Sequence, residues 1–225
     1  MTPFISLPRS FYEPSAKLVA AKLLGHWLIR NAPDGPCGGV IVETEAYLTQ
    51  DPACHAYGGQ TKRNRAMWGP PGHSYVYFVY GNHWCFNVVC QPVGIAEAVL
   101  IRAVEPTIGL ELMRERRPVA DPRQLTNGPG KLCAAMDIDR NLDSIDLCNA
   151  DSPVFIAENK SLKSYLRQRG PKVTTTRIGI TQAAALPLRF FLAGSEFVSR
   201  RLVGAKSNAT VRDKADIVTE RKVNS

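Results

Sequence analysis

The chain has 225 residues, and 28 Lys and Arg against 20 Asp and Glu give it a formal net charge of +8. A composition of 44% hydrophobic and 21% charged residues excludes intrinsic disorder for most of the chain, and no apolar run approaches the ~20 residues that cross a bilayer. The first residues also lack the apolar core of a signal peptide. We therefore expect a soluble globular protein with no membrane partner, whose positive charge is compatible with nucleic acid without requiring it.

The cysteines and histidines indicate neither a disulfide framework nor a metal site. The six cysteines contain no Cys-x-x-Cys pair, and in a chain without an export signal they are expected to be reduced core thiols. No recognised zinc spacing links the residues that would have to form such a site. Those residues are Cys54, His55, His73, His83 and Cys85.

The N-terminal part predicts a short helix followed by two strands. Residues 10–13 have capping-box spacing, Pro14 suits a first helical turn and Gly25 suits a helix end. The apolar stripe between them consists of Ala16, Val19, Ala20, Leu23 and Leu24. Strands are then expected at 26–30 and 40–47, around a turn-rich stretch.

A long loop and a hairpin occupy the middle of the chain. Residues 48–72 show no periodicity, and a loop of that length is usually either functional or disordered. The β-rich runs 73–80 and 83–90 flank Gly81-Asn82, which is a signal for a tight hairpin.

The later part predicts strands at 97–104, 174–181 and 186–193, and helices at 106–116 and 129–136. We therefore expect an α+β fold in one domain, residues 1–199. A polar, poorly ordered C-terminal tail, residues 200–225, follows it and contains seven basic and three acidic residues.

Two carboxylates and an aromatic ring share one face of the strand at 40–47. A period of two places Glu43, Glu45 and Tyr47 together, although acids are poor strand formers. An edge strand with a solvated face would explain them. A pocket that holds a carboxylate for acid–base chemistry would also explain them, and the segment by itself leaves both interpretations open.

Tyr80 and Arg102 are the other unusual positions. Aromatic residues often only stabilise hairpins, but Tyr80 lies at the hairpin tip, where an aromatic side chain of a basic protein is a candidate wedge for a DNA base stack. Arg102 interrupts the apolar run 98–104. If Arg102 is buried it needs a carboxylate such as Glu43 or Glu45, and on a half-exposed strand it would instead point to solvent.

Six motifs occur in an order that carries a family resemblance. They are VETEAY (42–47), His55 with Gly58-Gly59 and Thr61-x-Arg63-Asn64, PGHSYVYFVYGNHWCFN (71–87), VLIRAVEP (99–106), NGPGKLC (127–133) and RIGI (177–180). From about Leu7 to Ser199 the chain closely resembles the alkyladenine (3-methyladenine) DNA glycosylases of the mammalian type, which also occur in many bacteria.

The resemblance implies a fold and an activity. The fold is a single mixed domain around a curved antiparallel sheet with a protruding hairpin, similar to the formyltransferase C-terminal-domain-like fold. The activity is that of a monofunctional, monomeric base-excision repair enzyme of the cytoplasm or nucleoid. It flips an alkylated or deaminated purine out of double-stranded DNA and hydrolyses the N-glycosidic bond, with no cofactor, metal or amine nucleophile. The implied bases are 3-methyladenine, 7-methylguanine, hypoxanthine and ethenoadenine.

Catalytic roles are implied for three residues. Glu45 matches the family's general base, which activates the water that attacks the deoxyribose C1′. Arg102 and the backbone of Ile178 match the two other groups that hold this water. A guanidinium beside Glu45 would keep the carboxylate ionised at neutral pH.

Base-binding roles are implied for five more. Tyr47, His55 and Tyr77 match the residues that sandwich the extruded base, and His55 also matches one that hydrogen-bonds it. Tyr80 matches the tyrosine that fills the gap left in the duplex, and Asn87 matches the residue that hinders the 2-amino group of guanine.

DNA phosphate contacts are expected from the basic loop and from a helix start, although a solvated basic loop would look the same. These residues are Lys62, Arg63, Arg65 and Lys131. Two positions depart from the family pattern. Asn82 stands where a bulky apolar residue is common, and Cys54 stands where a small residue such as Ser or Ala is more usual.

Two other interpretations compete with the glycosylase. A non-catalytic binder of damaged or distorted DNA would use the same hairpin but would not need every catalytic position to be filled. A formyltransferase-type enzyme is similar only in overall fold, since the chain lacks a pterin-binding pattern and a catalytic Asn-His-Asp set.

Overall fold

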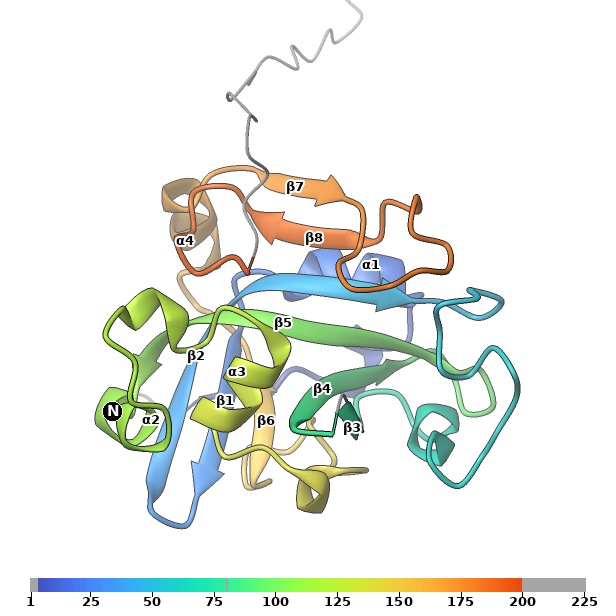
Figure 1. Ribbon diagram of the computed structural model, residues 1–225, viewed down its shortest axis with the longest axis horizontal. Coiled ribbons are helices and arrows are strands. Elements are labelled where there is room, and N and C mark those ends of the chain that lie inside the picture. The colour runs from blue at the N-terminus through green and yellow to red at the C-terminus, as the bar shows by residue number, and fades with distance from the viewer. Residues whose placement is uncertain (1–3, 80, 200–225) are drawn as a thin grey trace, which may run out of the picture.

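The computed structural model describes residues 4–79 and 81–199 and has a mixed α+β fold in a single domain (Figure 1). Its sheet is antiparallel and curls into a half-barrel, with the strand order β3-β4-β5-β2-β1-β6, while β8 pairs with both β2 and β7. The strands are β1 Trp27–Ala32, β2 Gly35–Tyr47, β3 Ser74–Val79, β4 His83–Cys90, β5 Glu97–Ile108, β6 Val154–Ala157, β7 Lys172–Thr175 and β8 Arg189–Leu192. The helices are α1 Ala16–Leu23, α2 Leu110–Arg116, α3 Pro129–Ala135 and α4 Leu162–Gln168. Short 3-10 turns lie at Arg9–Phe11, Arg65–Trp68, Pro122–Gln124 and Arg140–Leu142.

The central strand β2 changes one of its neighbours along its length. Its first half pairs with β1, its second half pairs with β8, and β5 accompanies nearly all of it. The second half of β2 is therefore flanked on both sides, so the interpretation of Glu43 and Glu45 as residues of a solvated edge strand is wrong. Both side chains have no exposed surface.

Helices cover both faces of the sheet in the view of Figure 1, with α3 in front of it and α1 behind it. The apolar stripe of α1 is buried against β2 and β5, and Thr44 of β2 donates a hydrogen bond to the Ala20 carbonyl of that helix. Because side chains alternate along a strand, Glu43 and Glu45 point away from α1. The helix thus orients the carboxylates by holding the opposite face of β2.

The predicted helices are confirmed, but two of them begin later than expected. Ser10 lies in a 3-10 turn, and α1 begins at Ala16. Pro106 does not open a helix, because β5 continues through it to Ile108. Pro106 lies opposite Gly39 at a shift in register, where a missing N–H is tolerated. The next helix begins after Gly109, whose φ of +65° favours glycine.

The strand predictions succeed for the hairpin and fail near the C-terminus. The strand predicted at 83–90 is confirmed as β4, and β3 pairs with it from Ser74 to Val79. The strand predicted at 174–181 is wrong beyond Thr175, since the chain turns there. The strand predicted at 186–193 is reduced to Arg189–Leu192, and the sequence patterns did not predict β6 or α4.

All six cysteines are free thiols, and five of them are buried. Among the described residues, no helix is both long and apolar enough to cross a membrane. The predicted tail, residues 200–225, lies outside the part of the chain that the structure describes.

Candidate active site

Two compensating irregularities between β2 and β5 place an arginine beside the carboxylates of β2. The pairing passes over Val42 on β2 and then over Arg102 on β5. Such bulges turn side chains away from the regular alternation and are common next to active sites. Arg102 is thereby buried and in contact with Glu43 and Glu45. The interpretation of Arg102 as an exposed strand residue is wrong, and the expectation of a carboxylate partner is confirmed.

Three donors surround the Glu45 carboxylate. The Ile178 backbone N–H donates to Oε1 at 2.8 Å, and the Tyr47 hydroxyl and Arg102 Nη1 donate to Oε2 at 3.0 and 3.1 Å. Burial and the neighbouring Glu45 raise the pKa of Tyr47, so its phenol stays protonated and remains a donor. The pKa of Arg102 is raised despite its burial, because Glu45 and Glu43 favour the charged guanidinium.

Glu43 is held by a second set of donors. Arg102 Nε and Arg189 Nε both donate to Oε1, at 3.0 and 2.7 Å. Ser199 adds its hydroxyl to Oε1 and its backbone N–H to Oε2, at 2.8 and 2.6 Å. Arg102 also donates to the Ser199 hydroxyl from Nη2, at 3.3 Å. One guanidinium therefore bridges both carboxylates.

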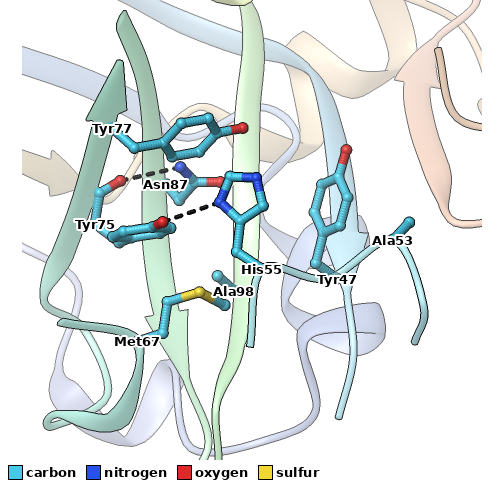
Figure 2. Close-up of a pocket in the computed structure, with 8 residues that line it drawn as sticks. All are labelled: Tyr47, Ala53, His55, Met67, Tyr75, Tyr77, Asn87 and Ala98. Atoms are coloured by element: carbon cyan, nitrogen blue, oxygen red, sulfur yellow. Dashed lines mark hydrogen bonds between the residues drawn. The ribbon is translucent and has the colours of Figure 1, made fainter. Parts of the chain in front are cut away.

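Beside the carboxylates lies a small cavity, and aromatic side chains make up half of its lining residues (Figure 2). Tyr47 stands on one side of it, and His55 and Tyr77 stand on the other. The His55 and Tyr77 rings meet edge to face with centroids 4.4 Å apart. The cavity measures about 20 Å³, which is room for about one water molecule. Its lining consists of Tyr47, Ala53, His55, Met67, Tyr75, Tyr77, Asn87 and Ala98.

A larger cleft adjoins this cavity and extends it toward Arg102. It encloses about 260 Å³ and shares Tyr47, Ala53, His55 and Tyr77 with the cavity. Its other lining residues are Val79, Cys85, Leu100, Arg102, Pro129, Ile178, Gly179 and Ile180. The aromatic walls and the donors around Glu45 thus border one continuous depression.

His55 is fixed in orientation and kept neutral. Its Nδ1 shares a hydrogen bond of 2.9 Å with the Tyr75 hydroxyl. His55 is an exposed residue, but partial burial of its imidazole lowers the pKa of His55 and the Arg63 guanidinium lowers it further. A neutral imidazole leaves one donor and one acceptor nitrogen, so His55 Nε2 can exchange a hydrogen bond with a ligand.

The side chain of Asn87 is oriented by the hairpin itself. Asn87 on β4 lies opposite Tyr75 on β3, and its Nδ2 donates to the Tyr75 carbonyl at 3.0 Å. This bond uses one of the two amide N–H donors inside the sheet. The Asn87 side chain, which lines the cavity, is therefore fixed against the wall that carries Tyr75 and Tyr77.

A buried ion pair joins two loops behind the Tyr47 ring. Arg177 donates to both carboxylate oxygens of Asp51 and to the Ala46 carbonyl. Its guanidinium carbon lies 4.7 Å from the centre of the Tyr47 ring. Since Arg177 lines neither the cavity nor the cleft, it supports Tyr47 from behind. The next residue, Ile178, provides the backbone N–H that binds Glu45.

The loop at 48–72 is ordered largely by one buried side chain. The side-chain Nδ2 of Asn64 donates to the backbone carbonyls of His55 and Gly59 at 2.9 Å each, and its side-chain Oδ1 accepts from the Thr61 N–H. These bonds fix the part of the loop that carries His55. This part of the loop is therefore held in place by side-chain hydrogen bonds, and a short 3-10 turn follows it at Arg65–Trp68.

The basic residues expected to meet DNA phosphates differ in their surroundings. Lys62 and Arg65 are exposed. Arg63 donates to the Phe78 carbonyl of the hairpin, and its guanidinium carbon lies 5.9 Å from the Tyr77 ring centre. Lys131 donates to the side-chain carbonyls of Gln124 and Asn127.

Tyr80, the expected wedge, lies outside the described residues. Its neighbours are described, and they show that β3 and β4 form the hairpin with Gly81 at a φ of +72° in the turn. Within residues 4–79 and 81–199, no three His, Cys, Asp or Glu side chains gather as metal ligands would.

The residues that the sequence patterns missed include four polar side chains that support Glu43 or Tyr47. Arg177 lies in the RIGI motif, which implied no role for it, and no role was predicted for Asp51, Arg189 or Ser199. Arg189 had the same signal as Arg102, namely a charge inside the apolar strand segment 186–193. Asp51 and Ser199 lie in irregular segments, where no periodic pattern marks a buried polar residue.

The chain is similar to a known family over most of its length. The profile of the family described as methylpurine-DNA glycosylase (MPG) matches residues 10–196. A relative from Methanoculleus marisnigri is 49% identical over 197 residues, 88% of this chain and 100% of its own length. A relative from Carboxydothermus hydrogenoformans is 45% identical, with 87% and 99% covered, and one from Rhodopseudomonas palustris strain BisB18 is 48% identical, with 86% and 90% covered. All three carry the provisional name 3-methyladenine DNA glycosylase.

Proposed function

Because the chain belongs to the methylpurine-DNA glycosylase family and is thus a DNA glycosylase, we propose that it excises alkylated purines from double-stranded DNA, with 3-methyladenine as its main substrate. The proposed reaction is hydrolysis of the N-glycosidic bond by a water molecule that Glu45 activates. One observation carries the proposal: the three donors to Glu45 come from the same side chains and backbone segment that line the cleft beside the aromatic cavity.

The aromatic walls account for the choice of base. An extruded purine stacks between Tyr47 on one side and His55 with Tyr77 on the other, and each such contact is worth about 1–3 kcal/mol. Alkylation at N3 or N7 gives the purine a positive charge, which electron-rich tyrosine rings attract. Neutral His55 favours such a base as well, since an imidazolium would repel it.

Asn87 contributes to discrimination against normal guanine. Its amide is tied to the Tyr75 carbonyl, so the side chain does not turn away to make room for a 2-amino group. Discrimination of this kind comes from a group that the site rejects, as well as from contacts that it makes. Adenine-derived lesions and hypoxanthine lack the 2-amino group and meet no such obstacle.

The chemistry needs a base and a negative charge rather than a strong nucleophile. A cationic purine is already a good leaving group, so positive charge develops on the sugar as the bond to C1′ breaks. The Glu45 carboxylate stabilises that charge and accepts a proton from the attacking water. Arg102 and the Ile178 backbone hold the water in place. In this scheme the bond from C1′ to the base breaks, the bond from C1′ to the water oxygen forms, and the departing base takes up the bonding electrons.

Nucleotide flipping has a cost that the hairpin offsets. Extruding a base costs about a few kcal/mol, and least for a damaged pair. Tyr80, which lies outside the described residues, would fill the gap in the stack, while Lys62, Arg63, Arg65 and Lys131 would contact phosphates. The cavity of about 20 Å³ is too small for a purine, so the base occupies the adjoining cleft and parts Tyr47 from His55 as it enters.

The direct test is the identity of the released base. Duplex DNA methylated with dimethyl sulfate is incubated with the protein, and the soluble products are separated by chromatography beside authentic 3-methyladenine and 7-methylguanine. We expect free 3-methyladenine, and none from unmethylated duplex. Tight binding of methylated duplex without release of any base would contradict the proposal and indicate a non-catalytic binder of damaged DNA.

A further inference from the structure

The proposed base belongs to a buried network of two carboxylates and two guanidiniums. We propose that Arg189, on β8, is a positioning residue for the reaction: it neutralises Glu43 and so leaves the charge of Arg102 available to Glu45. This inference rests on the proposed function of Glu45.

Arg189 is remote from the substrate side of the site. Its side chain is buried, and it lines neither the cavity nor the cleft. Its Nε donates to Glu43 Oε1 at 2.7 Å, and its guanidinium carbon lies 4.8 Å from the Phe191 ring centre. Cross-strand pairing places its Cα opposite that of Glu45, yet its Nε donates diagonally to Glu43. Arg189 therefore acts on Glu45 through Glu43 and Arg102.

Arg102 divides its donors between the two carboxylates. Its Nε binds Glu43 and its Nη1 binds Glu45, at 3.0 and 3.1 Å. One positive charge would therefore have to balance two buried negative charges if Arg102 were alone. Leaving a buried charge uncompensated is strongly unfavourable. The second cation needed for a neutral network is Arg189.

Within the described residues, 4–79 and 81–199, the other groups that face this network do not replace Arg189. From β2, Tyr47 donates a hydrogen bond to Glu45 and carries no charge. From β4, the Cys85 thiol is neutral, since burial raises its pKa. From the segment after β7, Arg177 is paired with Asp51. Near the end of the described chain, Ser199 supplies uncharged donors.

A change in this charge balance has a defined effect on the pH dependence of the reaction. Without Arg189, the two carboxylates share one guanidinium, and the pair takes up a proton at a higher pH than in the native protein. Protonation of the pair removes the base. The acid limb of the pH–rate profile, where the rate falls as the pH is lowered, therefore moves to higher pH.

The experiment measures the single-turnover rate of 3-methyladenine release between pH 5 and pH 9 from duplex DNA methylated with dimethyl sulfate. Arg189→Gln keeps a donor but removes the charge, and its acid limb should move up by about one pH unit. Arg189→Lys keeps the charge, and its acid limb should stay at the wild-type pH. Glu43→Gln combined with Arg189→Gln restores neutrality and should return the limb toward the wild-type position. Arg30→Gln is the matched control, because Arg30 is a buried arginine that donates to the backbone carbonyls of Asn31, Asp137 and Pro153 and does not touch the site.

An acid limb at the wild-type pH in folded Arg189→Gln overturns the inference, as does a slow double variant whose limb stays displaced. If Arg189→Gln does not fold, Glu43→Gln alone carries the test: it leaves an excess positive charge, so its limb should move to lower pH, and an unmoved limb overturns the inference. Failure of wild-type protein to release any base overturns the proposed function instead.

Discussion

Tyr47 brings two separable properties to the site. Its ring forms one wall of the cavity, supported from behind by Arg177, and its hydroxyl donates to Glu45 at 3.0 Å. In the proposed mechanism, base binding depends on the ring, and the orientation of the Glu45 carboxylate depends on the hydroxyl. A change that removes only the hydroxyl should therefore affect chemistry without affecting binding.

We predict that Tyr47→Phe lowers the single-turnover excision rate by about ten- to a hundredfold, the equivalent of losing a hydrogen bond to a charged group worth about 1.5–3 kcal/mol. Its affinity for a lesion duplex should change less than threefold, or about 0.6 kcal/mol. Tyr47→Leu, the matched variant without a ring, should lose both. A Tyr47→Phe variant that binds as weakly as Tyr47→Leu would show that the ring alone does not account for stacking.

The sequence predicts the residues of the site better than it predicts their partners. Resemblance of motifs identified Glu45, Arg102 and Ile178, and the structure brings these three together. The sequence did not predict the role of Arg189, because its partner Glu43 lies 146 residues away along the chain. Which buried arginine meets which carboxylate is set by the neighbours of β2, and no local pattern encodes that choice.

At the scale of elements, the Asp51–Arg177 pair ties together the two loops that flank Tyr47. Both side chains are almost fully buried. Asp51 also accepts a hydrogen bond from the Ala53 N–H, in the turn that leads to His55. The pair thus links the loop that carries His55 to the segment that presents Ile178 to Glu45.

We predict that Arg177→Met or Asp51→Asn alone lowers the free energy of unfolding by about 3–5 kcal/mol, because each leaves a buried partner unpaired. The double variant should be more stable than the sum of the two losses implies. Denaturation in urea measures this, with Arg123→Met as the control, since Arg123 forms an exposed pair with Asp121 that is worth at most about 1 kcal/mol. Strict additivity of the two losses would contradict the proposed coupling.

The elements that the sequence predicts correctly are those whose local signals agree with their surroundings. The strand predicted at 83–90 is β4 because a run rich in strand-forming residues follows a two-residue turn. The Pro106 helix prediction failed because a proline that commonly begins helices here lies at a strand irregularity opposite Gly39. An added Cβ at Gly39 would lie 2.3 Å from the Glu105 carbonyl oxygen, so the close approach of these two strands, which is a tertiary feature, decides the local structure.

At the scale of the whole molecule, two histidines make stability depend on pH. Burial lowers the pKa of His26 below the ordinary value of 6.5, although the nearby Glu158 opposes this shift. Burial together with Arg63 lowers the pKa of His55. At a pH below 6.5, each of these histidines binds a proton more readily in the unfolded chain than in the folded chain. Their contribution to the free energy of unfolding is therefore fully present above pH 6.5 and is lost as the pH falls below that value.

We predict that the free energy of unfolding in urea decreases between pH 7.5 and pH 5.0, a range above the titration of most carboxylates. His26→Gln combined with His55→Gln should flatten this decrease. A wild-type stability that is constant or rises as the pH falls through this range would contradict the stated pKa directions.

The whole molecule also shows where prediction from sequence ends. The α+β class and the single domain followed from the alternation of elements and are confirmed by the half-barrel sheet with its helices. The similarity to formyltransferase C-terminal domains, the monomeric state and the boundary at residue 199 stay predictions. The closure of β8 onto the second half of β2 depends on contacts between distant segments, and this closure is what buries Glu43 and Glu45.

The central claim is that Glu45 performs the chemistry rather than holding the fold. The most direct measurement compares wild-type protein with Glu45→Gln on one duplex that contains a single lesion, recording both dissociation constant and single-turnover excision rate. The account predicts a rate lower by about 10²- to 10⁴-fold with lesion affinity unchanged, because Gln keeps the size and an acceptor of the side chain but not its charge. Equal loss of affinity and rate, or excision at the wild-type rate, would contradict it.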